Sequence, residues 1–296
     1  MRPAERPPPS FGLYLPQVNR GYRDLLSFAK AAEQCGFTAV WLMDHLVLPG
    51  RPGPVLEGWT LATALAAATS RIRIGHLVLC DSFRHPVLLG SMAATLDHIS
   101  EGRLNLGLGW GSSPTELRLL GRTPASAAGR AGRLAESIAI ISAVLDGRDI
   151  DHRGAHFIVA AGGIGPGAAR RRVPLFIGGA SERTMKLVRE HADWWNCPAM
   201  ERRRLAQLTP LAGSARISVN YSLAVTPRPV GRPRPGSFPL TGTAAEIAEV
   251  LRADRALGAE HFVIQFTDPA VTPAELERFM TEIAPAVGGP EGDSQA

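Results

Sequence analysis

The hydrophobic positions of the chain fall into short apolar runs that alternate with longer amphipathic stretches. Short apolar runs bounded by turn residues are typical of buried parallel strands, and apolar residues spaced three and four apart are typical of helices. The first strand is predicted at 11–15, ended by Pro16, and the first helix at 22–35, ended by Gly36. The same alternation continues along the chain, which predicts a parallel α/β architecture.

Eight predicted strands alternate with eight predicted helices. The further strands are expected at 39–42, 72–79, 104–109, 175–178, 194–196, 217–225 and 261–266, and the further helices at 59–69, 87–99, 131–145, 181–191, 200–207, 243–257 and 273–283. Right-handed crossovers close such a repeat into a single (β/α)8 TIM barrel over residues 11–285. An open doubly wound sheet is the alternative, and it is disfavoured because no glycine fingerprint opens the helix after the first strand.

Some segments depart from the repeat. Residues 146–172 are predicted to be a small insertion, with a hairpin at 149–160. The Pro-rich loop at 226–240 is expected to be extended and stiff, and its place after the seventh strand suggests that it covers a substrate. The two ends, 1–10 and 286–296, are expected to be disordered tails.

Composition predicts an ordinary soluble protein. The 296 residues are 45% hydrophobic, which is ample for a core. The chain start has no signal-like segment, and no apolar stretch reaches the ~20 residues of a membrane span, so we expect a cytoplasmic protein without membrane association. The net charge is +5, but the basic residues are spread out, so nucleic-acid binding is not expected. Three cysteines far apart predict neither disulfides nor a zinc site.

Polar residues collect where the predicted strands end, which is the side on which α/β barrels place function. Asp44 and His45 end an otherwise apolar strand. His45 is the candidate for proton transfer or for a hydrogen bond to a substrate, because imidazole titrates near working pH. A structural pair between His45 and Asp44 is the alternative. No metal is predicted, because no ligand spacing accompanies His45, and a hydrolase elbow is also missing.

Two glycine-rich segments also follow strands. Gly107, Gly109 and Gly111 alternate at the end of the fourth strand, where they strip one face of side chains so that a flat ring or an extended chain can approach the backbone. Tight packing at that corner is the alternative. Residues 178–180 precede a predicted helix, a position that suits a phosphate, and Ser181 also suits the role of N-cap.

The order and spacing of several blocks, from about Phe11 to Phe266, resemble the bacterial luciferase-like superfamily. The blocks are WLMDH at 41–45, EGWT at 57–60, AATSRIRIG at 67–75, RHP at 84–86, TLDHISEGRL at 95–104, GLGWG at 107–111 with Glu116, Arg130 with Arg133 and Glu136, IGG at 177–179 and ADWWN at 192–196. The resemblance implies a (β/α)8 barrel that binds a flavin or the deazaflavin coenzyme F420 at its strand ends. The sequence is most similar to the F420-dependent branch, whose members move a hydride to or from C5 of the deazaflavin, and a homodimer is the habit of the family.

The resemblance also implies roles for individual residues. It places His45 near the reacting carbon and Asp44 against the ring or its hydroxyl, and it implies a non-prolyl cis peptide at Leu77–Val78. The residues it assigns to the cofactor are Asp44, Leu77, Val78, Cys80, Gly109, Trp110, Gly111, Ser112, Gly178, Gly179 and Ala180, the last three at the phosphate.

One position departs from the pattern of the superfamily. Some of its sugar-phosphate dehydrogenases have a catalytic glutamate directly after the Gly-x-Gly, where Ser112 stands in this chain, so that specific activity is not expected. Glu116 is the nearest carboxylate, and we expect it to pair with an arginine.

The sequence leaves other functions open beside an F420-dependent oxidoreductase acting on a small organic substrate. One is an FMN-dependent monooxygenase that uses reduced flavin and oxygen, and another is a barrel that binds a flavin without turnover. The run Arg202, Arg203 and Arg204 follows the sixth strand, on the ligand side. It is interpreted either as a site for the carboxylates of a polyglutamate tail or as an exposed helix face.

Overall fold

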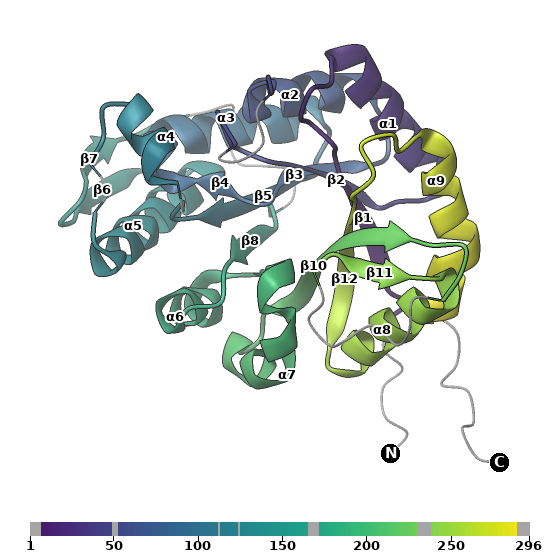
Figure 1. Cartoon of the computed structure of the whole chain (residues 1–296). Helices are drawn as coiled ribbons and strands as arrows, with labels where there is room; N and C mark the ends of the chain where they lie inside the picture. The colour runs from purple at the N-terminus through teal and green to yellow at the C-terminus, as the bar shows by residue number, and fades with distance from the viewer. Residues whose placement is uncertain are drawn as a thin grey trace.

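Eight parallel strands close into a barrel surrounded by helices (Figure 1). A computed structural model describes residues 7–48, 53–111, 113–123, 125–164, 172–229 and 238–288. Around the barrel the strands follow the order β1 (Ser10–Tyr14), β2 (Ala39–Leu42), β3 (Arg73–His76), β5 (Leu104–Gly109), β8 (Leu175–Gly178), β9 (Trp194–Cys197), β10 (Arg216–Val225) and β12 (Ala259–Phe266). Pairing of β12 with β1 closes the barrel, so the predicted TIM barrel is confirmed.

The helices lie outside the barrel, close to their predicted positions. They are α1 (Tyr22–Cys35), α2 (Gly58–Ala68), α3 (Pro86–Ile99), α5 (Ala127–Leu145), α6 (Glu182–His191), α7 (Leu205–Leu208), α8 (Ala244–Ala256), α9 (Pro273–Arg278) and α10 (Ala284–Gly288), with short turns η1 (Asp81–Phe83), η2 (Ala199–Arg204), η3 (Thr209–Ala212) and η4 (Phe279–Ile283). Local sequence fixes their starts: Glu57 caps α2, and Thr243 with Glu246 forms a capping box on α8. None of the described helices combines the length and hydrophobicity needed to cross a bilayer.

The third predicted strand is interrupted. β3 ends at His76, a cis peptide joins Leu77 to Val78, and β4 (Leu79–Cys80) then pairs with β5. The implied cis peptide is therefore confirmed, and the continuous strand at 72–79 is not.

Several boundaries also differ from expectation. α4 (Pro114–Leu119) forms in a stretch predicted as loop, and β11 (Leu240–Gly242) pairs with β10. Ser10 belongs to β1 and the last helix continues to Gly288, so regular structure extends into both of the segments that were predicted to be disordered. The predicted hairpin is present as β6 (Ile150–Arg153) and β7 (Ile158–Ala161). Residues 230–237 of the Pro-rich loop lie outside the described ranges.

Aromatic side chains fill the interior of the barrel toward the amino ends of its strands. Phe176 and Trp194 stack with ring centroids 5.2 Å apart, and the Trp41 indole Nε1 donates to His261 Nε2 at 2.9 Å. We call these four residues the aromatic plug. Trp194 begins β9 and His261 lies near the start of β12, so the plug leaves the opposite end, where the strands finish, to form the site.

Candidate active site

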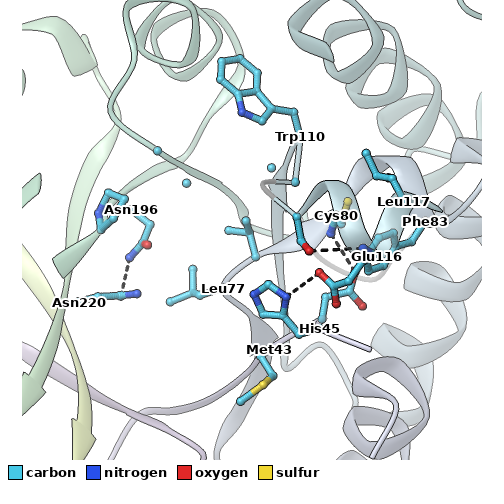
Figure 2. Close-up of a pocket in the computed structure, with 18 residues that line it drawn as sticks. Met43, His45, Leu77, Cys80, Phe83, Trp110, Glu116, Leu117, Asn196 and Asn220 are labelled. Atoms are coloured by element: carbon cyan, nitrogen blue, oxygen red, sulfur yellow. Dashed lines mark hydrogen bonds and ion pairs between the residues drawn. The ribbon is translucent and has the colours of Figure 1, made fainter. Parts of the chain in front are cut away.

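Two adjoining cavities open where the strands end. The first, which we call the groove, has a volume of about 310 Å³ and is lined by residues of the loops after β2, β4, β5 and β8 (Figure 2). The second, which we call the chamber, has a volume of about 830 Å³ and is lined by residues that follow or end β1, β10 and β12. Met43, His45 and Asn220 line both cavities, so a molecule in the groove and one in the chamber meet at these side chains.

The structure brings most of the predicted site residues together. Those that line the groove are Asp44, His45, Leu77, Val78, Cys80, Gly109, Trp110, Gly111, Gly178 and Gly179. Ser112 lies outside the described residues. Ala180 is buried and lines a separate cavity beside α6.

Asp44 is held by groups of the protein itself. Its Oδ1 and Oδ2 accept hydrogen bonds of 2.8 Å from the two terminal nitrogens of Arg84, and Oδ2 also accepts the Cys80 backbone N–H at 2.8 Å. Burial opposes the charge on Arg84, but the hydrogen bonds and negative charges of Asp44 and Glu57 together outweigh it and raise the arginine pKa. Because these contacts occupy the carboxylate, we interpret Asp44 as a positioning residue that joins β2 to β4. The alternative pair with His45 does not form.

His45 pairs instead with Glu116, which the sequence had assigned to an arginine. The His45 Nδ1 lies 2.8 Å from Glu116 Oε2, while Glu116 Oε1 accepts the backbone N–H groups of Leu46 and Val47 at 2.7 and 3.2 Å. Since a carboxylate accepts, Nδ1 carries a proton, which in the neutral imidazole leaves the Nε2 lone pair available. The His45 side chain is 36% exposed, that of Glu116 only 2%, and no described residue bonds to Nε2.

A local signal could have placed Glu116 on a helix, although not against His45. Ser113 is followed by Pro114 and, three residues on, by Glu116, the pattern that begins a helix. In the structure the Ser113 side chain accepts the Glu116 N–H at 3.4 Å and α4 begins there. The contact with His45, 71 residues away, has no sequence signal.

The glycines of the groove have a packing role. A Cβ on Gly109 or Gly178 would lie 2.5 or 2.8 Å from a methyl of Val78, which is too close. The alternative explanation from sequence, tight packing, therefore holds at Gly109, and the structure adds the same constraint at Gly178, where it was not predicted. The same packing leaves backbone atoms, and no side chains, at this wall of the groove. It is therefore compatible with the other interpretation, in which a flat ring approaches the backbone there. Arg130 donates to the Gly111 carbonyl at 3.0 Å, and its guanidinium lies 5.9 Å from the Trp110 ring.

The loop before α6 is anchored to β9 through the backbone N–H and carbonyl of Gly179. Gly179 donates its N–H to the Asn196 carbonyl at 3.3 Å and accepts from the Trp195 indole at 2.7 Å. Ser181 caps α6 by accepting the Thr184 N–H at 3.1 Å, as expected for an N-cap. The first-turn N–H groups of α6 that have no helical acceptor remain as donors for an anion.

Asn220 was missed at the sequence level. Asn196 Nδ2 donates to Asn220 Oδ1 at 2.9 Å and to Ser218 Oγ at 3.2 Å, and Figure 2 shows the two amides together on the side of the groove away from Cys80 and Phe83. A signal was present: Ser218, Asn220 and Ser222 alternate with apolar residues along β10. In a barrel strand, a polar residue at every second position indicates a polar lumen.

The arginine run after β9 does not form one surface. Arg202 is buried and pairs with Asp254, which also accepts the Tyr221 hydroxyl at 2.6 Å. Arg204 is exposed and pairs with Glu201 at 2.8 Å. Neither interpretation of the run, a site for a polyglutamate tail or an exposed helix face, therefore holds for Arg202, whose charge is neutralised by Asp254 inside the fold.

A closed parallel eight-stranded barrel, with a backbone-walled groove at its strand ends and His45 lining that groove, defines a TIM barrel with a candidate ligand site. Residues 9–212 match the model of the luciferase-like monooxygenase family. The chain belongs to this family.

The chain is also similar in sequence to individual proteins. The F420-dependent glucose-6-phosphate dehydrogenase of Amycolatopsis mediterranei is 35% identical over 140 residues, 46% of this chain and 42% of that protein. The F420-dependent hydroxymycolic acid dehydrogenase of Mycobacterium tuberculosis is 27% identical over 260 residues, 86% of this chain and 67% of that protein. The matches to the first three curated relatives span only 39%, 42% and 55% of their lengths.

A solved structure shares the fold. An F420-dependent secondary alcohol dehydrogenase in complex with an F420–acetone adduct superposes with a TM-score of 0.80 and 19% identity, over 95% of this chain and 99% of that one.

Proposed function

We propose that the protein is an F420-dependent oxidoreductase that transfers a hydride between the deazaflavin and a small organic substrate. The relatives that use F420 support this proposal. The observation that carries it is the position of His45, which lines both the groove and the chamber while Glu116 holds its Nδ1. A group placed this way can act on a substrate in the chamber beside a cofactor in the groove.

The groove fits a flat, mostly apolar ring. Gly109 and Gly178 contribute backbone to its walls, and Leu77 and Val78 contribute apolar surface. We assign Leu77, Val78 and Cys80 to the ring, the segment 109–112 to the ring and its ribityl chain, and 178–180 to the phosphate. When bound, F420 supplies a carbon, C5, that accepts or donates the hydride.

His45 would handle the proton that accompanies the hydride. With Nδ1 donating to Glu116, Nε2 is an acceptor, so it can take the proton of a substrate hydroxyl while the carbon loses its hydride. In the reverse direction the imidazolium returns the proton to the carbonyl oxygen. Glu116 stabilises the positive charge that His45 carries between the two events.

The chamber favours an uncharged substrate. Among its described lining residues, Arg20 is the one arginine or lysine, and its guanidinium donates to the Pro269 and Val271 carbonyls at 2.7 and 3.3 Å. The rest of the described lining combines apolar side chains with the amides of Gln17, Asn220 and Gln265, several hydroxyl groups, His45 and one carboxylate, that of Asp268. A phosphate group would find little to neutralise it, so we propose a neutral alcohol or ketone and not a sugar phosphate.

The alternative is an FMN-dependent monooxygenase, which the description of the matched family supports. It places reduced FMN in the same groove and gives His45 a role in oxygen chemistry. A third possibility, binding without turnover, predicts cofactor affinity with no activity.

Fluorescence titration with F420, FMN and FAD separates these proposals. We expect F420 to bind at least about 100-fold more tightly than FMN, a difference near 3 kcal/mol. With a panel of secondary alcohols, His45→Ala should lower turnover about 100-fold or more and leave F420 affinity unchanged. Tighter binding of FMN would favour the monooxygenase. Unchanged turnover in His45→Ala would remove the histidine from the mechanism.

A further inference from the structure

A basic cavity lies between α6 and the segment from η2 to η3. Its volume is about 410 Å³, and its lining includes Arg183, Lys186 and Arg189 from α6 and Arg204 from η2. All of these side chains are exposed. Glu182 is the one acidic side chain among the described residues that line it, so the cavity carries net positive charge. We call it the basic cavity.

The basic cavity begins where the groove ends. Gly178 and Gly179 line the groove, and the next residue, Ala180, lines the basic cavity. Since consecutive Cα atoms are about 3.8 Å apart, the two spaces are separated by no more than the width of this loop. A ligand whose phosphate rests at residues 178–180 would send any further extension toward the basic cavity.

The cations on α6 are spaced for an extended anionic chain. Arg183, Lys186 and Arg189 recur every third residue, so they lie along one side of the helix. At about 1.5 Å per residue they span about 9 Å, which is the length of roughly three residues of an extended peptide. Arginine also binds carboxylates through two parallel hydrogen bonds.

These cations are available to a ligand, unlike Arg202. Neither Arg183 nor Arg189 forms an ion pair with another described residue. Lys186 lies 4.0 Å from Glu190, and Arg204 lies 2.8 Å from Glu201, but both pairs are solvent-exposed. Exposed ion pairs contribute little and are readily exchanged for a ligand carboxylate.

We propose that the basic cavity binds the carboxylates of the oligoglutamate tail of F420. The inference rests on the proposed function, because it takes F420 as the occupant of the groove. It moves the tail contacts from the 202–204 run to α6, with Arg204 as the member of that run that takes part. It also explains how the chain would prefer F420 over flavins that end at their phosphate.

The test compares two ligands by fluorescence titration: F420 with its oligoglutamate tail, and the same deazaflavin phosphate without glutamates. At roughly 50 mM salt we expect the tailed form to bind the unaltered protein about tenfold more tightly, and at roughly 500 mM salt we expect equal affinities. The double variant Arg183→Gln/Lys186→Gln should abolish the difference, and Arg183→Glu/Lys186→Glu should make the tailed form bind more weakly than the tail-less one. The matched control, Lys30→Gln/Arg278→Gln, removes two exposed charges from α1 and α9, on another side of the barrel from α6 (Figure 1), and should keep the difference.

The outcomes separate the inference from the proposed function. Equal binding of both ligands at low salt, or a tail preference that survives the charge-reversed variant, would overturn the inference while F420 binding itself stands. Failure of both ligands to bind would overturn the proposed function, and the tail site with it. Loss of the preference in the α1/α9 control as well would show that net charge, not the basic cavity, attracts the tail.

Discussion

Two histidines near opposite ends of the barrel show how the same type of residue serves two purposes. We call the end that holds the aromatic plug the closed end, and the end that holds the groove and the chamber the open end. His261 belongs to the aromatic plug: its Nε2 accepts from the Trp41 indole, and its Nδ1 lies 2.8 Å from Ser10 Oγ. His45 stands at the open end, with Nδ1 against Glu116 and Nε2 facing the cavities. Because the Trp41 indole only donates, His261 accepts with Nε2 and carries its proton on Nδ1. His45 also carries a proton on Nδ1, because Glu116 accepts there. They differ in what meets the other nitrogen.

This difference decides which histidine can take part in chemistry. Burial, together with the positive charge of Arg216, lowers the pKa of His261 to about 3, so it stays neutral at working pH. A proton on its Nε2 would also face the indole N–H. His45 has a carboxylate behind it and space in front, which is the arrangement of a proton acceptor. The closed end stabilises the barrel, and the open end is free to react.

The largest expected effect is at the closed end. Trp41→Ala should lower the free energy of unfolding by about 4 kcal/mol, because it leaves a cavity and removes the donor to His261. Trp41 is fully buried. Urea denaturation measures the loss, and Ile158→Ala is the control, expected to change stability little because Ile158 is 80% exposed. A Trp41→Ala protein as stable as the control would show that the aromatic plug does not hold the barrel together.

The sequence was a good guide to the architecture. Strands such as Ala39–Leu42 are buried on both faces, so a short run of consecutive apolar residues is enough to predict them. The break after His76 is different, because apolar residues continue through it and only the family resemblance placed the cis peptide. Short pieces such as β11 depend on pairing with a distant strand, which no local pattern records.

At the open end the sequence located residues but not their partners. Asp44 and His45 were found because polar residues end an apolar strand. Their partners, Arg84 and Glu116, lie 40 and 71 residues along the chain. An ion pair between distant loops depends on how the barrel closes, so it becomes visible only in the structure. Arg202 shows the same limit, since its burial against Asp254 could not be inferred from a run of three arginines.

The dependence of the free energy of unfolding on pH, measured below about pH 6.5, tests whether His261 is neutral in the folded protein. The group titrates near 6.5 when unfolded and near 3 when folded, so between these values the unfolded chain binds the extra proton. Stability is therefore fully present above about pH 6.5 and falls as the pH drops toward 3. Relative to His261→Gln, which cannot titrate, the protein should lose about 2.5 kcal/mol between about pH 6 and about pH 4. Parallel profiles of the two proteins would contradict a neutral His261.

The partner of His45 can be changed without removing the histidine. In Glu116→Gln, the amide oxygen can keep the Leu46 and Val47 contacts, so its NH₂ group faces His45 Nδ1 and forces the proton onto Nε2. We expect turnover to fall about 30-fold, equivalent to about 2 kcal/mol, with F420 affinity within about twofold.

Glu136 provides the matched control for this change. Its carboxylate accepts backbone N–H groups of the β6–β7 hairpin and lies 3.1 Å from His152 Nε2, away from the groove. Glu136→Gln should therefore leave turnover unchanged. Equal losses in the two variants would mean that Glu116 acts through stability and not by positioning His45.

The smallest expected effect concerns Ser10, the outer member of the hydrogen-bonded chain at the closed end. Its hydroxyl lies 3.3 Å from the Glu260 carbonyl, to which it donates, and accepts the proton on His261 Nδ1. Ser10→Ala removes this acceptor from a buried donor and should lower the free energy of unfolding by about 1 kcal/mol. Urea denaturation measures the loss, and F420 affinity should not change because the groove lies at the other end of the barrel. An affinity change without a stability change would mean that the two ends are coupled, and the division between a closed structural end and an open reactive end would then fail.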